Sequence, residues 1–150
     1  MVENKHNPMD EPRYSGIPTF MRTPLVNDLS DLDIALVGVP YDGAVEARSG
    51  ARQGPRQIRD MSSMMRTTHH VTRINPYKLC RIADVGDVPF KQIFDVVASH
   101  NDITRFYKNL YKFGIVPLSA GGDHSITLPI MRAIASDRSI GLVHIDAHTD

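Results

Sequence analysis

The sequence predicts an α/β fold of three layers, in which helices cover both faces of a parallel sheet. Four short apolar runs, typical of buried strands, alternate with three segments whose apolar residues recur at helical spacing. No Asn-Gly turn or similar hairpin signal joins two consecutive runs, so each connection is expected to cross over through a helix. Side chains that can bind metal follow the third and fourth runs. Because ligands gather at the carboxyl ends of parallel strands, we expect a functional site at that edge.

Composition narrows the possible partners. The 150 residues suit one soluble domain, and 17 basic residues balance 17 acidic ones, which gives no electrostatic reason to expect nucleic acid or a membrane surface as partner. Cys80 is the one cysteine and cannot form a disulfide within the chain. Without a membrane-length apolar run or a secretory apolar segment at the start, we expect a cytoplasmic protein that acts on a small molecule.

We divide the chain into an arm over residues 1–30 and an α/β domain over residues 31–150. Pro8, Pro12, Pro18 and Pro24 disfavour a continuous helix in the arm. Tyr14, Ile17, Phe20 and Met21 offer apolar side chains that could fix the arm to a surface. Two interpretations stay open: a loosely ordered terminus, or an arm that packs on a neighbouring subunit.

The first strand is expected at residues 34–39, a continuous apolar run typical of a strand that is covered on both faces. A glycine-rich loop follows, and Gly54-Pro55 predicts a helix start with proline at its first position. Four arginines surround this start: Arg48, Arg52, Arg56 and Arg59. They are interpreted as solvated or ion-paired, with anion binding at the helix N-terminus as the alternative.

The remaining elements continue the same alternation. Residues 80–85 predict the second strand, and residues 92–113 a long amphipathic helix that is interrupted near residues 99–102 and ended by Gly114. The third strand, a further helix and the fourth strand are expected at residues 115–118, 125–135 and 139–145. His69-His70 falls between elements, and a loop pair without a role is the preferred interpretation.

Candidate ligands follow the last two strands. Gly121-Gly122 permits a sharp turn that presents His124, although alone this motif also fits a tight turn with a surface histidine. Asp146, His148 and Asp150 recur with period two, so an extended backbone would direct all three the same way. We expect these four side chains to share one crevice and to bind a divalent cation. His144 has the same parity as Asp146, but its place deeper in an apolar run favours a hydrogen-bonded core histidine.

The donor set indicates the kind of metal. Mixed imidazole and carboxylate ligands fit borderline to hard divalent ions, with Mn²⁺ favoured and Zn²⁺, Ni²⁺ or Fe²⁺ as alternatives. A carboxylate can also bridge two ions, which together lower the pKa of a shared water. The sequence therefore predicts a site of one or two metal ions.

Two motifs, Gly121-Gly-Asp-His-Ser125 and Val143-His-Ile-Asp-Ala-His-Thr-Asp150, resemble metal-binding signatures of the ureohydrolase family of arginases, agmatinases and guanidino-acid hydrolases. Segments of the N-terminal half also match in spacing: Val37–Asp42, Ser49–Arg59 and Ala83–Asp87. The segments Pro12–Arg22 and Met61–His70 resemble guanidinopropionase and guanidinobutyrase more closely than arginase.

The resemblance implies an arginase-like fold, a homo-oligomer (trimer or hexamer) and two Mn²⁺ ions. It assigns His124 and Asp150 to the first ion, His148 to the second, and Asp146 to both. It implies that a bridging hydroxide attacks a guanidinium carbon to release urea and an amine, with Asp150 near the nucleophile and helping to move the proton. The substrate is expected to be a guanidino acid such as 3-guanidinopropionate or 4-guanidinobutyrate, with agmatine as the alternative.

The later Asp-x-Asp signature of the family has no match in these residues. We therefore interpret the chain as the N-terminal portion of a ureohydrolase and expect it to be inactive by itself. The alternatives are a non-catalytic product that binds one metal weakly and an interaction partner of intact family subunits.

Overall fold

The computed structural model describes residues 8–148. Its strands are β1 (Ile34–Val39), β2 (Ile82–Asp87) and β3 (Val116–Gly121), and its helices are α1 (Gly54–Ser62), α2 (Val96–Lys112) and α3 (Thr127–Ile134). Short 3₁₀ turns precede or connect them, among them η2 (Phe20–Arg22) and η5 (His124–Ile126). Within residues 8–148, no helix combines the length and the apolar character that crossing a membrane requires.

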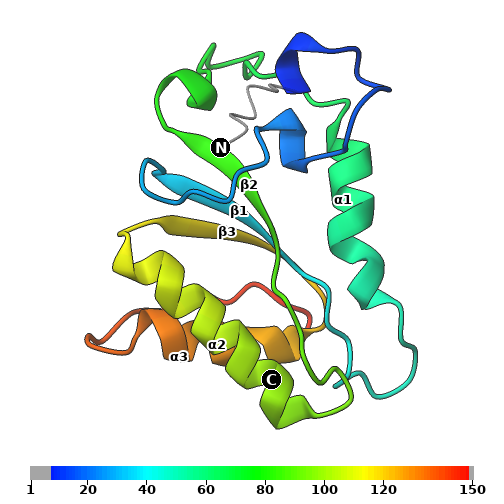
Figure 1. Cartoon of the computed structure of the whole chain (residues 1–150), viewed down its shortest axis with the longest axis vertical. Coiled ribbons are helices and arrows are strands. Elements are labelled where there is room, and N and C mark those ends of the chain that lie inside the picture. The colour runs from blue at the N-terminus through cyan, green and yellow to red at the C-terminus, as the bar shows by residue number, and fades with distance from the viewer. Residues whose placement is uncertain (1–7, 149–150) are drawn as a thin grey trace.

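The sheet is parallel, in the order β2-β1-β3. β1 and β3 pair without interruption from Ile34↔Val116 to Val39↔Gly121, whereas the pairing of β1 with β2 is irregular between Leu36 and Gly38. The expected three-layer arrangement is confirmed: Figure 1 shows α1 on one side of the sheet and α2 with α3 on the other. All three strands end at the same edge, and η5, which begins with His124, follows β3 there.

The central strand explains why the core forms. The side chains of Ala35, Val37 and Val39 are fully buried and belong to the same apolar cluster as Ile103 and Tyr107 of α2. Gly38 points to the opposite face, where a Cβ atom would meet Pro55 at the start of α1. The continuous apolar run of β1 is thus covered by helices on both faces, as expected for a parallel sheet.

The long helix α2 begins later than expected. Asp95 caps it by accepting a hydrogen bond from the Ala98 amide at 2.9 Å, and Gly114 ends it with a φ of 71°. The interruption of the apolar pattern has a physical cause, because Ser99 and Asp102 are buried but paired. Asp102 accepts the Lys91 amide at 2.9 Å, so this polar residue fixes the loop before the helix.

The expected fourth strand is wrong. Residues 139–148 have no strand in the structure, and Leu142, Val143 and Ile145 are exposed. A strand is stabilised by a partner along its backbone, and within residues 8–148 the outer edge of β3 remains unpaired. The apolar run therefore lies beside α3, without the ladder hydrogen bonds that its sequence favours.

The arm is held by its own chain. Phe20 is buried, and its amide donates to the Asp84 carboxylate of β2 at 2.9 Å. The Met21 amide donates to the Ser62 hydroxyl of α1 at 2.8 Å, and the Val26 amide donates to the Asp84 carbonyl at 3.0 Å. Tyr14 and Ile17 are exposed. Residues 20–26 of the arm are thus hydrogen-bonded to β2 and α1 of the same chain.

Candidate metal centre

A glycine turn at the end of β3 presents His124. Gly122 has a φ of 64°, and a Cβ atom there would lie 2.4 Å from the Tyr41 carbonyl oxygen and 2.5 Å from that of Val39. Only glycine fits this close approach, as the Gly-Gly pair predicted. Asp123 then caps η5 by accepting the Ser125 amide at 2.9 Å, and His124 is the first residue of this short turn.

His124, His144 and Asp146 form a cluster in which one potential ligand atom of each lies within 4.8 Å of the others. The Asp146 Oδ2 atom is 3.4 Å from His144 Nε2 and 3.7 Å from His124 Nδ1. The two imidazole rings are tilted against each other with their centroids 5.0 Å apart. Segments 20 residues apart in the sequence thus converge at the carboxyl edge of the sheet, as expected for His124 and Asp146.

His148 lies near the other oxygen atom of the same carboxylate. Its Nδ1 atom is 3.7 Å from Asp146 Oδ1, and its side chain is 81% exposed. The backbone bends here, and the His148 amide donates to Asp146 Oδ1 at 3.0 Å. The extended geometry that would direct Asp146 and His148 the same way is therefore wrong. Asp150, the fourth expected ligand, lies outside the described residues.

His144 is the residue that sequence reasoning undervalued. We expected a core histidine, but its side chain is exposed and lies against the Asp146 carboxylate. The core interpretation failed because it assumed a buried fourth strand. The signal that could have identified His144 was its parity with Asp146, which favours a common direction for the two side chains.

The pKa of Asp146 lies below its ordinary value. The main cause is the hydrogen bond from the His148 backbone amide, followed by the hydrogen bond from the His144 side chain. The backbone amide of Ala147 and the charge of His124 lower this pKa further. The carboxylate is therefore held in the charged form that binds cations.

The donor set fits a divalent cation. Two imidazole rings and one carboxylate already converge within metal-ligand range of one another, and their side chains reach solvent from which an ion can enter. Mixed nitrogen and oxygen donors suit Mn²⁺ and the other borderline divalent ions.

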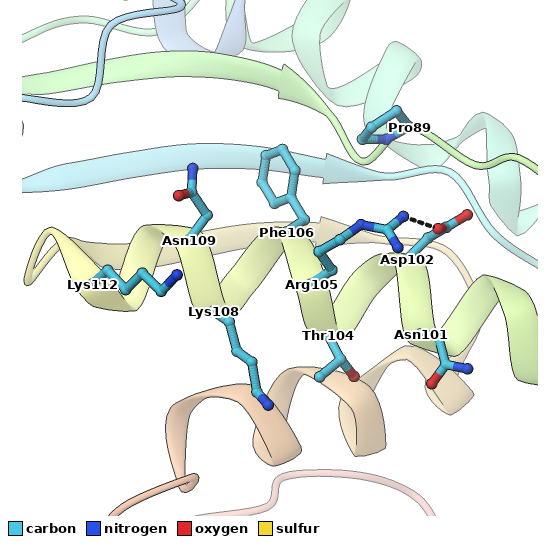
Figure 2. A pocket seen from close by; sticks show the side chains of 9 residues that line it. All are labelled: Pro89, Asn101, Asp102, Thr104, Arg105, Phe106, Lys108, Asn109 and Lys112. Carbon is cyan, nitrogen blue, oxygen red and sulfur yellow. Dashed lines mark hydrogen bonds and ion pairs between the residues drawn. The ribbon is translucent and has the colours of Figure 1, made fainter.

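A hollow of about 650 Å³ opens beside the cluster. It lies between α3 and the segment 142–145, and its lining combines His124 and His144 with apolar side chains such as Leu128 and Met131. A second hollow of about 620 Å³ runs along α2, and its lining includes neither histidine (Figure 2). There Asp102 is already paired with Arg105, so that hollow offers no free carboxylate to a metal. Of these two hollows, the one beside the histidines adjoins the candidate ligands.

The arginines near α1 have structural partners. Arg52 pairs with Asp42, and Arg59 pairs with both Asp84 and Asp87. The ion-paired interpretation is confirmed for these two residues. His69 and His70 lie in a loop and pack ring against ring, with centroids 5.3 Å apart.

Comparison with known proteins gives a consistent result. The model of the arginase family matches residues 32–150. The chain is similar to guanidinopropionase of Pseudomonas aeruginosa, with 49% identity over 99% of this chain and 48% of the relative. It is also similar to guanidinobutyrase of the same organism, with 43% identity over 100% of this chain and 49% of that relative. The chain thus spans about half the length of these relatives.

Solved structures agree on the fold. A hypothetical agmatinase from Burkholderia thailandensis superimposes with a TM-score of 0.79 at 30% identity, covering 84% of this chain and 40% of that one. Proclavaminate amidino hydrolase from Streptomyces clavuligerus superimposes with a TM-score of 0.78 at 34% identity, covering 84% and 42%. The sheet and its helices thus have the same arrangement as part of these larger chains.

Proposed function

This chain belongs to the arginase family, and on that premise we propose that the natural full-length protein hydrolyses a guanidino compound to urea and an amine. The observation that carries the proposal is the convergence of His124, His144 and Asp146 at the carboxyl edge of the sheet. These residues come from the two motifs that resemble the metal-binding signatures of the family. Without this cluster, membership of the family would support a conclusion about the fold but not about the activity.

We assign the candidate ligands by the same resemblance. Asp146 would be shared by two ions, His124 and Asp150 would hold the first ion, and His148 would hold the second. His144 orients the bridging carboxylate, since its Nε2 atom lies 3.4 Å from Asp146 Oδ2. The position of the Asp146 carboxylate among three histidines supports this assignment.

When bound, a pair of Mn²⁺ ions supplies a water of lowered pKa as nucleophile. In the overall reaction a C–O bond forms at the guanidinium carbon, and the bond from that carbon to the substituted nitrogen breaks. Urea leaves, and both protons of the water end on the substituted nitrogen, which departs as an ammonium ion. Asp150, next to the nucleophile in this proposal, would help to move a proton to that nitrogen. Mn²⁺ is the preferred ion, with Ni²⁺, Zn²⁺ or Fe²⁺ as alternatives.

The substrate we propose is a guanidino acid, 3-guanidinopropionate or 4-guanidinobutyrate. Identities of 49% and 43% to proteins named guanidinopropionase and guanidinobutyrase support a substrate with a carboxylate. Agmatine is the second candidate, supported by 43% identity to the mitochondrial agmatinase of Gallus gallus over 92% of this chain. The two classes differ in the charge at the end of the substrate remote from the guanidinium.

Assembly and location follow as further parts of the proposal. We expect a homo-oligomer, a trimer or a hexamer, in the cytoplasm. The arm over residues 1–30 is the segment that we expect to reach a neighbouring subunit, because Tyr14 and Ile17 expose apolar side chains. The domain over residues 31–150 would form the N-terminal portion of the catalytic domain.

Urea release by the purified natural full-length protein tests the proposal. The protein is stripped of metal, reloaded separately with Mn²⁺, Ni²⁺, Zn²⁺ or Fe²⁺, and supplied with 3-guanidinopropionate, 4-guanidinobutyrate or agmatine. We expect Mn²⁺-dependent urea release, with a higher kcat/KM for a guanidino acid than for agmatine. A preference for agmatine would favour the second candidate. Metal binding without urea from any of the three compounds would support a non-catalytic role.

A further inference from the structure

The aspartate before His124 is held from three directions. The Asp123 amide donates to the Tyr41 carbonyl at 2.8 Å, and the Ala44 amide donates to Asp123 Oδ2 at 2.9 Å. Asp123 Oδ1 accepts both the amide and the hydroxyl of Ser125, at 2.9 Å and 2.5 Å. The loop after β1 thus fixes Asp123 from one side, and Ser125 fixes it from within η5.

Ser125 also contacts α2. Its Oγ atom lies 3.2 Å from the Nε2 atom of His100. A carboxylate only accepts hydrogen bonds, so the single proton of the Ser125 hydroxyl is donated to Asp123. The hydroxyl oxygen must then accept from His100, which requires a proton on His100 Nε2. The His100 ring also meets Tyr41 edge-on, with the centroids 6.0 Å apart.

We propose that His100 is a positioning residue for His124, acting through a donor chain from His100 Nε2 to Ser125 and on to Asp123. This inference rests on the proposed function, since it treats His124 as a metal ligand. The side chain of His124 is 39% exposed and contacts Asp146 and His144, which lie in a segment without a strand partner among the described residues. Its backbone belongs to η5, and the contact of His100 with Ser125 joins that backbone to the long helix α2. A ligand held in this way keeps its geometry without the metal.

Three variants of the natural full-length protein test the chain of donors. His100→Ala removes the donor, whereas His100→Gln keeps an N–H group near the position of Nε2. Thr104→Val is the matched control: Thr104 lies one turn further along α2 and donates to the Pro129 carbonyl of α3 at 3.1 Å, without contact to Ser125. It removes a hydrogen bond between α2 and α3, the helix that directly follows η5.

Two measurements distinguish a role of His100 in positioning His124 from a general contribution to the stability of the fold. The first is Mn²⁺ affinity by titration calorimetry, which His100→Ala should weaken about tenfold or more, the loss typical of residues that orient metal ligands. His100→Gln and Thr104→Val should keep the affinity of the unsubstituted protein. The second is hydrogen exchange in metal-free protein, followed in a peptide that contains the amides of Asp123 and Ser125. Exchange there should be faster in His100→Ala than in the other two variants.

The outcomes distinguish this inference from the proposed function. If His100→Ala and Thr104→Val lower thermal stability alike and change neither Mn²⁺ affinity nor the exchange of these amides, His100 is a structural residue and the inference is overturned. An equal loss of Mn²⁺ affinity in His100→Gln and His100→Ala would overturn the role of the proton that His100 donates. If the unsubstituted protein releases no urea, the proposed function fails, while the exchange comparison still decides whether His100 orders this turn.

Discussion

At the scale of single residues, Asp146 determines the character of the candidate site. Its two oxygen atoms face three imidazole rings, and a backbone amide fixes its orientation. If this carboxylate bridges two ions, its loss uncouples both from the attacking water. A histidine that holds one ion has a more limited effect, because raising the metal concentration can refill a weakened site.

This difference predicts that substitutions of Asp146 and His124 lower the activity of the natural full-length protein to different extents. Asp146→Asn should lower kcat/KM for the guanidino substrate by more than about a hundredfold, beyond the range for residues that only orient ligands, and excess Mn²⁺ should not restore it. His124→Asn should regain part of its activity as Mn²⁺ is added. His70→Asn serves as a control, since His70 lies in the loop over residues 66–75. If Asp146→Asn and His124→Asn lose the same activity and added Mn²⁺ fully restores both, the bridging role is contradicted.

A second residue, Asp42, organises the loop before α1. Its buried carboxylate accepts hydrogen bonds from the Arg52 guanidinium and from the Gly50 amide, the latter at 2.6 Å. The Arg52 hydrogen bond is the largest cause that lowers the Asp42 pKa, which falls from 3.8 to about 2. A carboxyl group whose pKa is lower in the folded state stabilises the fold above its unfolded pKa and loses this contribution as the pH falls.

We therefore expect Asp42 to make stability depend on pH between about 4 and about 2, the interval from its ordinary pKa to its folded one. The melting temperature of the natural full-length protein should fall across this interval, and Asp42→Asn should be less stable at neutral pH but show a smaller fall. Asp10→Asn controls for the loss of one exposed negative charge. If the melting temperature falls equally with pH in the unsubstituted protein and in Asp42→Asn, Asp42 is not responsible for the pH dependence.

At the scale of elements, Arg59 joins α1 to β2 and to the arm. Its guanidinium donates to the fully buried Asp84 carboxylate at 2.8 Å and to Asp87 at 2.6 Å, and it lies over the Phe20 ring at 4.1 Å. Asp84 also accepts the Phe20 amide. Removing the cation leaves a buried carboxylate without its main charge partner, which costs more than the ion pair itself contributes.

Arg59→Met should accordingly lower the free energy of unfolding by about 3 kcal/mol, as for other buried ion pairs that lose one partner. Arg56→Met is the matched control, because Arg56 is exposed on the same helix. Its effect should stay within about 0.5 kcal/mol. Denaturant unfolding of the natural full-length protein measures both values. Similar values for the two variants would mean that Arg59 is not the counter-charge of Asp84.

At the scale of the whole molecule, β3 is an edge strand with apolar side chains in solvent. Val116 and Leu118 are 62% and 56% exposed, and the nearby segment with Leu142, Val143 and Ile145 is exposed as well. Central strands of parallel sheets are normally covered, and an open apolar edge favours association. Asp146 and His148 lie next to this open surface, on a segment without a strand partner among the described residues.

A polypeptide of these 150 residues alone should therefore bind Mn²⁺ weakly and be partly unfolded or oligomeric. It should release no urea from 3-guanidinopropionate, 4-guanidinobutyrate or agmatine. The measurements are titration with Mn²⁺, sedimentation, and a urea assay on material of verified mass. Metal-dependent urea from this polypeptide, free of any longer enzyme, would contradict the expectation.

The sequence by itself determined what depends on local chemistry. The apolar run at residues 34–39 predicted β1 because a strand covered on both faces needs apolar side chains throughout. Gly114 and Gly122 marked the helix end and the sharp turn because both positions have a positive φ. The metal-binding residue types at the carboxyl ends of the expected strands predicted that His124 and Asp146 would meet.

Only the tertiary structure decided what depends on contacts between distant segments. Residues 139–145 have the composition of a strand, but a strand also needs a backbone partner, and none of the described segments pairs with them. Their exposure moved His144 from an expected core position to the Asp146 carboxylate. The contact between His100 and Ser125 was equally invisible in the sequence, because the packing of α2 against η5 and α3 brings together side chains 25 residues apart.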